Sequence, residues 1–157
     1  MLSWARRMRL LGCKSRGFQA RMRSRTHPID RWHEVVAGLN VEALDDLLAS
    51  DVVFHSPVVH TPQQGAAITK LYLSAAFKVL NNDKFRYLRE VIGSSDAVLE
   101  FLTEIDGIQI NGVDMIRWNA EGKITDFKVM VRPLKAINLL HARMKQTLEE
   151  LGAIPRS

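Results

Sequence analysis

The sequence predicts one small α+β domain over residues 28–151, in which a curved, mostly antiparallel sheet wraps a largely apolar pocket. Up to about residue 80, apolar residues recur at helical spacing, with only one short strand between them. From Lys84 to Arg132 the pattern changes to strands separated by turn signals, and a last amphipathic stretch follows. The single cysteine, Cys13, excludes an internal disulfide, but a chain of this length buries a sufficient core without one.

Positive charge is concentrated at the N-terminal end. Residues 1–29 hold eight basic and no acidic side chains, whereas residues 30–157 hold 14 basic and 17 acidic ones. We therefore predict that residues 1–27 are a basic tail, with three interpretations: a mitochondrial transit peptide, an extension before a true first residue Met22, or a disordered arm that contacts nucleic acid or anionic lipid. The predicted location is the cytoplasm, or the mitochondrial matrix if residues 1–25 are a transit peptide. Residues 152–157 are predicted as a short C-terminal tail.

Several functional classes find no support in the sequence. No apolar run approaches the roughly 18 residues of a membrane span, so we expect no transmembrane segment. The predicted sheet lacks a basic face with interleaved aromatic residues, so the domain itself is not expected to bind nucleic acid. No set of histidines and carboxylates has the spacing of metal ligands, and no glycine-rich phosphate loop is present. We expect neither a metal nor a cofactor.

The first predicted elements are two helices and a strand. Pro28 suits the first helical position, and Gly38 marks the end of an apolar stripe formed by Ile29, Trp32, Val36 and Leu39. A second short helix opens at Asn40 and turns three residues inward: Leu44, Leu47 and Leu48. Residues 51–57 are predicted as a short strand that Pro57 ends.

Two longer helices are predicted farther along the chain. Thr61 and Gln64 have the spacing of a capping box, and the helix that follows presents an apolar stripe of Ile68, Leu71, Tyr72, Ala75 and Val79. The last helix runs from about Pro133 to Leu151. Its apolar residues, spaced by three and four, suit packing against the sheet or a second subunit: Leu134, Ile137, His141, Met144, Leu148 and Leu151.

Two hairpins set the register of the sheet. Asp106-Gly107 is a strong two-residue turn, which places Leu99 opposite Asp114. A four-residue loop over 119–122 would place Asp114 opposite Phe127. Both hairpins turn the same side chains toward the core: Ala97, Leu99, Phe101, Ile105, Ile108, Ile110, Ile116, Phe127, Val129 and Val131.

Asp114 lies in the middle of this predicted apolar face. A carboxylate among apolar side chains is costly to ionise, so we expect its pKa to rise unless a cation or several donors serve it. A neutral carboxylic acid can donate a hydrogen bond to a developing oxyanion or act as a general acid. The alternative is a structural aspartate that bonds a buried backbone amide or Trp32.

Residues 112–124, Gly-Val-Asp-Met-Ile-Arg-Trp-Asn-Ala-Glu-Gly-Lys-Ile, resemble the penultimate hairpin of the nuclear transport factor 2-like superfamily. Residues 31–57 resemble its N-terminal half. This group includes ketosteroid isomerases, limonene-epoxide-type hydrolases, SnoaL-like polyketide cyclases and many non-catalytic binding domains. The resemblance implies a cone-shaped α+β fold and a homodimer that forms through the outer face of the sheet, but a fold alone does not imply a function.

The ketosteroid isomerase pattern matches only in part. Asp114 falls where that enzyme keeps a protonated, oxyanion-binding aspartic acid, and Trp32 falls where it keeps an oxyanion-hole tyrosine. Ser56 replaces the general-base aspartate that precedes a proline, so steroid isomerisation is disfavoured. In the epoxide hydrolase pattern Asp106 could supply one carboxylate, but Val129 and Glu104 replace the other carboxylate and the arginine, which disfavours that reaction too.

The predicted catalytic residues are Asp114 as the acid and His60 as a candidate base. The predicted ligand contacts are Trp32, Phe54, Ser56, Tyr72, Leu99, Phe101, Ile116 and Phe127. One hypothesis is an enzyme that isomerises, cyclises, dehydrates or hydrolyses an apolar metabolite bearing a carbonyl or hydroxyl group. The other is a non-catalytic carrier or dimerisation domain. A second titrating group near Asp114 would favour the enzyme.

Overall fold

The computed structural model describes residues 27–154, so the predictions for the basic tail lie outside the described residues. The elements follow the order α1 (Pro28–Gly38), a 3-10 helix (Val41–Ala43), α2 (Leu44–Leu47), β1 (Leu48–His55), β2 (Gln63–Gln64), α3 (Ala66–Leu80), β3 (Arg86–Ile92), β4 (Asp96–Ile105), β5 (Ile108–Trp118), β6 (Ile124–Arg132) and α4 (Leu134–Glu150). No helix in this part of the chain is long and apolar enough to cross a membrane.

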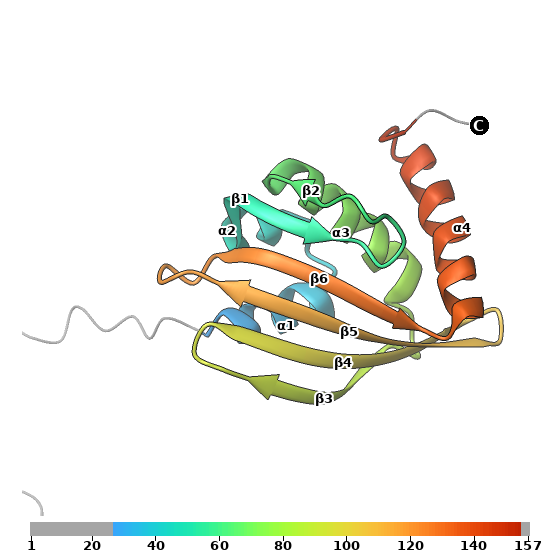
Figure 1. Cartoon of the computed structure of the whole chain (residues 1–157), viewed down its shortest axis with the longest axis horizontal. Coiled ribbons are helices and arrows are strands. Elements are labelled where there is room, and N and C mark those ends of the chain that lie inside the picture. Colours follow the sequence, from blue (N-terminus) through green and yellow to red (C-terminus); the bar gives the residue numbers. More distant parts are fainter. Residues whose placement is uncertain (1–26, 155–157) are drawn as a thin grey trace, which may run out of the picture.

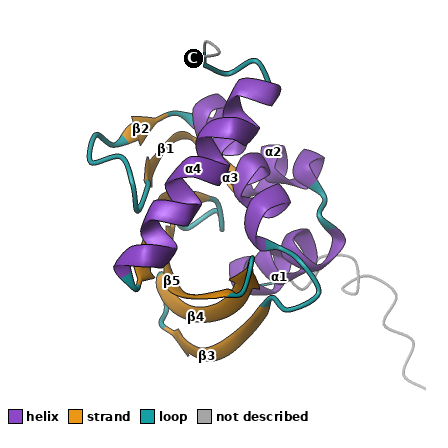
Figure 2. Ribbon diagram, turned by 90° about the vertical axis from the view of Figure 1, so that its right-hand side faces the viewer, coloured by secondary structure: helices purple, strands orange, loops and turns teal. Residues whose placement is uncertain are grey.

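The six strands form one curved sheet in the order β2-β1-β6-β5-β4-β3 (Figure 1). The β1–β6 pair is parallel and the other four pairs are antiparallel, which confirms the predicted, mostly antiparallel sheet. The helices gather on one side of this sheet (Figure 2), and α4 stands past the end of β6 (Figure 1). The core lies between the helices and the concave face of the sheet, where Trp32, Phe54, Leu99 and Phe127 are buried.

The N-terminal elements begin as predicted and differ at their ends. In α1, Ile29, Trp32 and Val36 are buried, but Leu39 follows the helix in a left-handed conformation (φ 50°) and is half exposed. The apolar stripe therefore ends at Val36. Strand β1 starts at Leu48, three residues before the predicted strand, because its first residues pair with β6.

The β4–β5 hairpin confirms the predicted register. Asp106 and Gly107 both have positive φ, 51° and 73°, as a tight two-residue turn requires. Ile105 pairs with Ile108, and Leu99 pairs with Asp114. Alternation along both strands then turns Leu99 and Asp114 toward the core.

The predicted register of the β5–β6 hairpin is wrong, by one residue at Trp118 and by two residues from Arg117 to Asn111. Trp118 pairs with Ile124, and an irregularity at Thr125 makes Asp114 face Val129 instead of Phe127. The loop is longer than predicted because Asn119 organises it: the Asn119 side-chain oxygen accepts hydrogen bonds from the amides of Glu121 and Lys123. A shift of two residues preserves the side-chain alternation, so the predicted core face stays correct.

The predicted capping box at Thr61 is also wrong. Gln63 and Gln64 form β2 and pair with Phe54 and Val53, so α3 begins only at Ala66, after Gly65 with φ 101°. Backbone pairing with β1 thus takes precedence over a local cap. Of the predicted stripe, only Ala75 is fully buried. The buried side chains of α3 are instead Thr69, Leu73, Ala75, Phe77 and Leu80.

Helix α4 is rotated relative to the predicted stripe. Ala136, Leu140 and Leu148 are its buried residues, whereas Leu134 is 71% exposed. The rotation follows from packing, because α4 contacts both α3 and the strands β5 and β6. One side of α4 therefore faces the interior next to Leu80 and Phe101.

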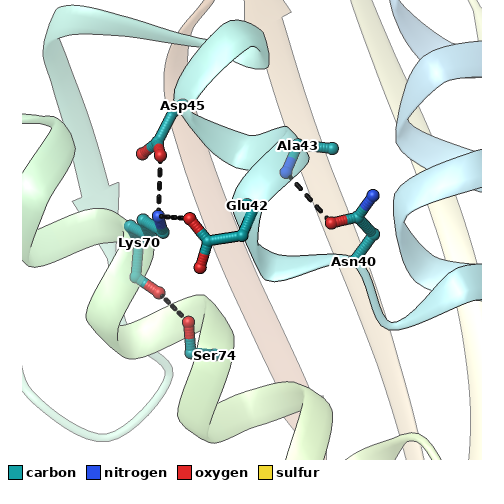
Figure 3. Close-up of polar contacts among 6 residues, drawn as sticks. All are labelled: Asn40, Glu42, Ala43, Asp45, Lys70 and Ser74. Atoms are coloured by element: carbon teal, nitrogen blue, oxygen red, sulfur yellow. Dashed lines mark hydrogen bonds and ion pairs between the residues drawn. The ribbon is translucent and has the colours of Figure 1, made fainter.

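A lysine ties α3 to the short helices before β1 (Figure 3). The Lys70 ammonium bonds Glu42 at 3.2 Å and Asp45 at 2.8 Å, and Ser74 donates to the Lys70 carbonyl at 2.6 Å. The Asn40 side chain accepts from the Ala43 amide and caps the 3-10 helix. These contacts fix the segment that leads into β1.

Candidate functional site

A cavity of about 280 Å³ lies between the concave face of the sheet and the helices. Its volume is near the lower end of the range for small-molecule sites, roughly 300–1,000 Å³. Most of its lining is aliphatic or aromatic, and the side chains come from α1, the end of β1, α3, the sheet and α4. The polar lining side chains from α1 and the sheet are Trp32, Tyr87 and Asp114. This is the kind of site that binds an apolar molecule and orients it through a few polar groups.

Asp114 lines this cavity from the middle of β5 and is only 6% exposed. Burial raises the pKa of Asp114 to about 7, because desolvation disfavours the charged carboxylate. A hydrogen bond from Tyr87 acts in the opposite direction on this pKa and is the smaller effect. Near neutral pH a large share of Asp114 therefore carries a proton.

Three polar side chains form a hydrogen-bonded chain that ends at Asp114. The Trp32 indole N–H donates to the Tyr87 hydroxyl oxygen at 2.9 Å, and the Tyr87 hydroxyl donates to Asp114 Oδ2 at 3.0 Å. Burial and the Asp114 charge raise the pKa of Tyr87 well above its usual range, so its hydroxyl stays protonated. With Tyr87 bonded to one oxygen, a proton on the other Asp114 oxygen can be donated to a ligand.

Sequence comparison assigns the chain that carries this site to a protein family. The sequence model of the SnoaL-like domain matches residues 29–127, which is more than half of the chain and includes β1, α3 and the Asp114 strand. The chain belongs to the SnoaL-like domain family. No curated protein matches it.

Solved structures agree with this family. The SnoaL-like domain is similar to a steroid delta-isomerase from Pseudomonas aeruginosa, with 33% identity over 81% of this chain and 93% of that one and a TM-score of 0.75. It is also similar to an uncharacterized bacterial protein with a cystatin-like fold from Silicibacter pomeroyi, with 32% identity, 78% and 85% coverage and a TM-score of 0.72. An NTF2-like protein from Mesorhizobium loti, with 19% identity, 68% and 88% coverage and a TM-score of 0.59, shares the fold alone. The predicted nuclear transport factor 2-like fold is confirmed.

Most of the predicted site residues line the cavity of the SnoaL-like domain. Two of the predicted ligand contacts, Leu99 and Ile116, lie elsewhere: both are fully buried in the core and are not among the lining residues. They share the inward face with Asp114, but their side chains pack in the core cluster that includes Trp32 of α1. The remaining predicted contacts line it together with Asp114: Trp32, Phe54, Ser56, Tyr72, Phe101 and Phe127.

The candidate base His60 does not reach this cavity. His60 is exposed on the loop between β1 and β2 and is not among the lining residues, so its catalytic role stays a prediction that requires movement of this loop. Ser56 does line the cavity, and its hydroxyl oxygen accepts hydrogen bonds from the amides of Val58 and Val59 at 3.1 and 3.3 Å. Ser56 therefore stabilises a turn and supplies no base.

Two other carboxylates, those of Asp126 and Asp106, do not line the cavity. Asp126 bonds His55, the last residue of β1, at 3.0 Å. Asp106 lies at the exposed β4–β5 turn and forms an ion pair with Arg143 at 2.6 Å. Asp106 thus cannot supply the carboxylate of an epoxide hydrolase site here. Within residues 27–154 no group of three or more histidine, cysteine, aspartate and glutamate side chains could hold a metal ion.

Sequence reasoning missed Tyr87, which is central to the site. Most of β3 is exposed, and its pairing with β4 changes register between Tyr87 and Arg89, so simple alternation along the strand fails. The available signal was the pair Phe85 and Tyr87, two aromatic residues at strand spacing before the exposed part of β3. Tyr87 pairs with Phe101, which was correctly predicted to face inward.

Proposed function

We propose that this SnoaL-like domain binds a small apolar metabolite with a carbonyl or hydroxyl group and that protonated Asp114 donates a hydrogen bond to its oxygen. The observation that carries the proposal is a protonatable carboxyl in the wall of an apolar cavity, held by a donor chain from Trp32 and Tyr87. Such a donor, fixed where little water competes, stabilises negative charge that develops on a bound oxygen.

The proposed reaction class is a cofactor-independent isomerisation, cyclisation or hydrolysis. In each, the oxygen of the substrate gains negative charge in the transition state, and Asp114 stabilises it by donating a hydrogen bond or transferring its proton. The similarity to a steroid delta-isomerase supports this class. Steroid isomerisation itself is not proposed, because Ser56 holds the amides of Val58 and Val59 and offers no base.

A non-catalytic ligand carrier is the second candidate. It is favoured because Ser56, which bonds the amides of Val58 and Val59, offers no base. An enzyme of this kind needs a base as well as an acid, and the predicted base His60 is outside the lining. A carrier needs only the apolar cavity and the donor. Both candidates share the same ligand chemistry, so one binding experiment tests their common basis.

The test compares acetonaphthone with ethylnaphthalene, two ligands of similar size of which only the ketone accepts a hydrogen bond. Calorimetry or fluorescence should show that the wild type prefers the ketone by about fivefold to tenfold, the value of one or two modest hydrogen bonds. Asp114→Leu should abolish this preference, because leucine cannot donate. Tyr87→Phe should reduce it, because the carboxyl then lacks its fixed partner.

The pH dependence makes the test specific. Because burial raises the pKa of Asp114 to about 7, the donor form is present below that value and is lost above it. The ketone preference should therefore fall between roughly pH 6 and pH 9 in the wild type and stay constant in Asp114→Asn, whose amide donates at both values. Asp51→Asn, an exposed change on β1, is the control. A preference that survives in Asp114→Leu would refute the proposal.

The proposed partner is a second copy of the chain that packs on the convex face of the sheet. Three cross-strand neighbours on this face, Val91, Val98 and Met115, are 63%, 38% and 40% exposed. Met130, which pairs with Val113, is 54% exposed on the same face. A row of exposed apolar side chains across adjacent strands is typical of a surface that another protein covers.

A further inference from the structure

Basic side chains from α4 line the mouth of the cavity. His141 and Lys145 both line it and lie four residues apart, so their side chains are neighbours on one face of the helix. His141 is exposed, and the Lys145 side chain is 49% exposed, so both stand at the open side of the cavity. Asp114, by contrast, is buried in the wall. The site therefore pairs an inner hydrogen-bond donor with an outer cation.

The charge of Lys145 is opposite in sign to the net charge of residues 30–157. Residues 30–157 hold more acidic than basic side chains, yet Asp114 is the only aspartate or glutamate among the described residues that line the cavity. Lys145 Nζ forms an ion pair with Glu149 Oε1 of the same helix at 3.9 Å, a separation that is too long for a hydrogen bond. The Lys145 ammonium therefore has donors left for an anion at the mouth.

The side chains between the two polar ends are apolar. Met144 and Leu148 of α4 line the cavity on one side, and Val58 and Val59, which follow β1, line it on another. A ligand that extends from Asp114 to Lys145 would thus be surrounded by hydrocarbon along its body. Its two ends would meet groups of different chemistry, which fixes its direction in the cavity.

We propose that Lys145, with His141 one helical turn away, forms an anion-binding subsite at the mouth, and that the ligand is an amphipathic acid. Its carbonyl or hydroxyl group reaches Asp114, its apolar body fills the cavity, and its anionic group contacts Lys145. This inference rests on the proposed function, because the same ligand must occupy the same cavity.

The test uses two fluorescent probes with the same rings, anilinonaphthalene sulfonate and neutral phenylnaphthylamine, titrated into the full chain. The wild type should bind the sulfonate more tightly. Lys145→Gln should weaken sulfonate binding by about fivefold, the effect of one half-exposed charge pair, and leave the neutral probe within about twofold. Lys145→Glu should weaken it further. In the double variant His141→Gln, Lys145→Gln the two probes should bind equally.

Lys135→Gln is the matched control, because Lys135 lies in the first turn of α4, is exposed and does not line the cavity. An unchanged sulfonate affinity in Lys145→Gln, or an equal loss in Lys135→Gln, would overturn the subsite. That failure is distinct from failure of the proposed function, in which the ketone preference would persist in Asp114→Leu. If neither probe binds the wild type, both proposals fail.

Discussion

At the scale of single residues, the protonation state of Asp114 decides what the site can do. The carboxyl has one fixed partner, the Tyr87 hydroxyl, and is otherwise surrounded by apolar lining. The folded protein therefore favours its neutral form. Because the same preference affects the free energy of unfolding, the state of Asp114 can be measured without knowing the ligand.

Asp114→Asn should flatten the pH dependence of stability. The pKa of Asp114 is about 7 in the folded chain, against about 3.9 for an unfolded aspartate, so the native state holds its proton more tightly. Stability is thus highest below the unfolded pKa and falls as pH rises toward the folded one. Three units correspond to at most on the order of 4 kcal/mol. Denaturant unfolding at roughly pH 5 and pH 8 should show this loss in the wild type and not in the variant.

The control for this measurement is Asp51→Asn. Asp51 is exposed on β1, so its replacement should leave the wild-type pH dependence unchanged. Taking the difference between wild type and variant removes every contribution to the pH dependence that the two proteins share. A pH dependence as large in Asp114→Asn as in the wild type would show that the carboxyl is ionised and solvated.

At the scale of elements, the accuracy of the sequence predictions follows the strength of each local constraint. The β4–β5 register was predictable because two residues with positive φ specify the turn, and it placed Asp114 on the core face. The β5–β6 register was not predictable, because the Asn119 side chain accepts hydrogen bonds from two loop amides and lengthens the loop. The inward and outward alternation of the side chains was still predicted correctly. Asp114 was therefore found as the candidate acid, although its neighbour on β6, Val129, was not.

In the helices, local sequence patterns were less reliable than in the β4–β5 hairpin. A local cap at Thr61 and an apolar spacing in residues 133–151 were valid patterns, but tertiary contacts override them: β2 pairs with β1, and α4 rotates to bury Leu140 instead of His141. That rotation is also what brings His141 and Lys145 to the cavity mouth. Neither event leaves a signal in a local window of sequence.

Gly112→Ala should destabilise the β4–β5 pair. Gly112 pairs with Phe101, and a Cβ at this position would overlap the Phe101 ring, with Cε1 only 2.6 Å away. The ring would have to turn within a packed wall of the cavity, at a cost of about 1–3 kcal/mol. Chemical denaturation should show this loss, and Phe101→Leu in the same chain should restore part of it by making room.

Gly38→Ala is the matched control for this change. Gly38 lies at the end of α1, and the nearest atom to an added Cβ is Asn40 Cβ at 3.9 Å, an ordinary contact. Its stability should be unchanged or slightly higher, because alanine restricts the unfolded chain. Equal stability of the Gly112 and Gly38 variants would contradict the role assigned to the Phe101 ring.

At the scale of the whole molecule, the convex face of the sheet predicts self-association. Val98→Lys combined with Met115→Lys should convert a dimer to a monomer, because both side chains lie in the centre of the exposed apolar row and two charges would be desolvated in each subunit. Sedimentation or light scattering over a range of concentrations measures this. Leu39→Lys, at an exposed apolar residue away from the sheet, should leave the dimer intact. A monomeric wild type at high concentration would refute the prediction.

The parallel pairing of β1 with β6 has a consequence for how the molecule is made. A ribosome releases β1 long before β6, which begins about 70 residues later at Ile124, so the first strand waits without its central neighbour. Helix α3 can already cover Phe54 through Tyr72, but the contact of Phe54 with Phe127 has to wait until β6 emerges. The nascent protein can therefore hold no ligand before synthesis is almost complete, and a ribosome stalled after β5 would display an unpaired strand edge that attracts chaperones or other chains.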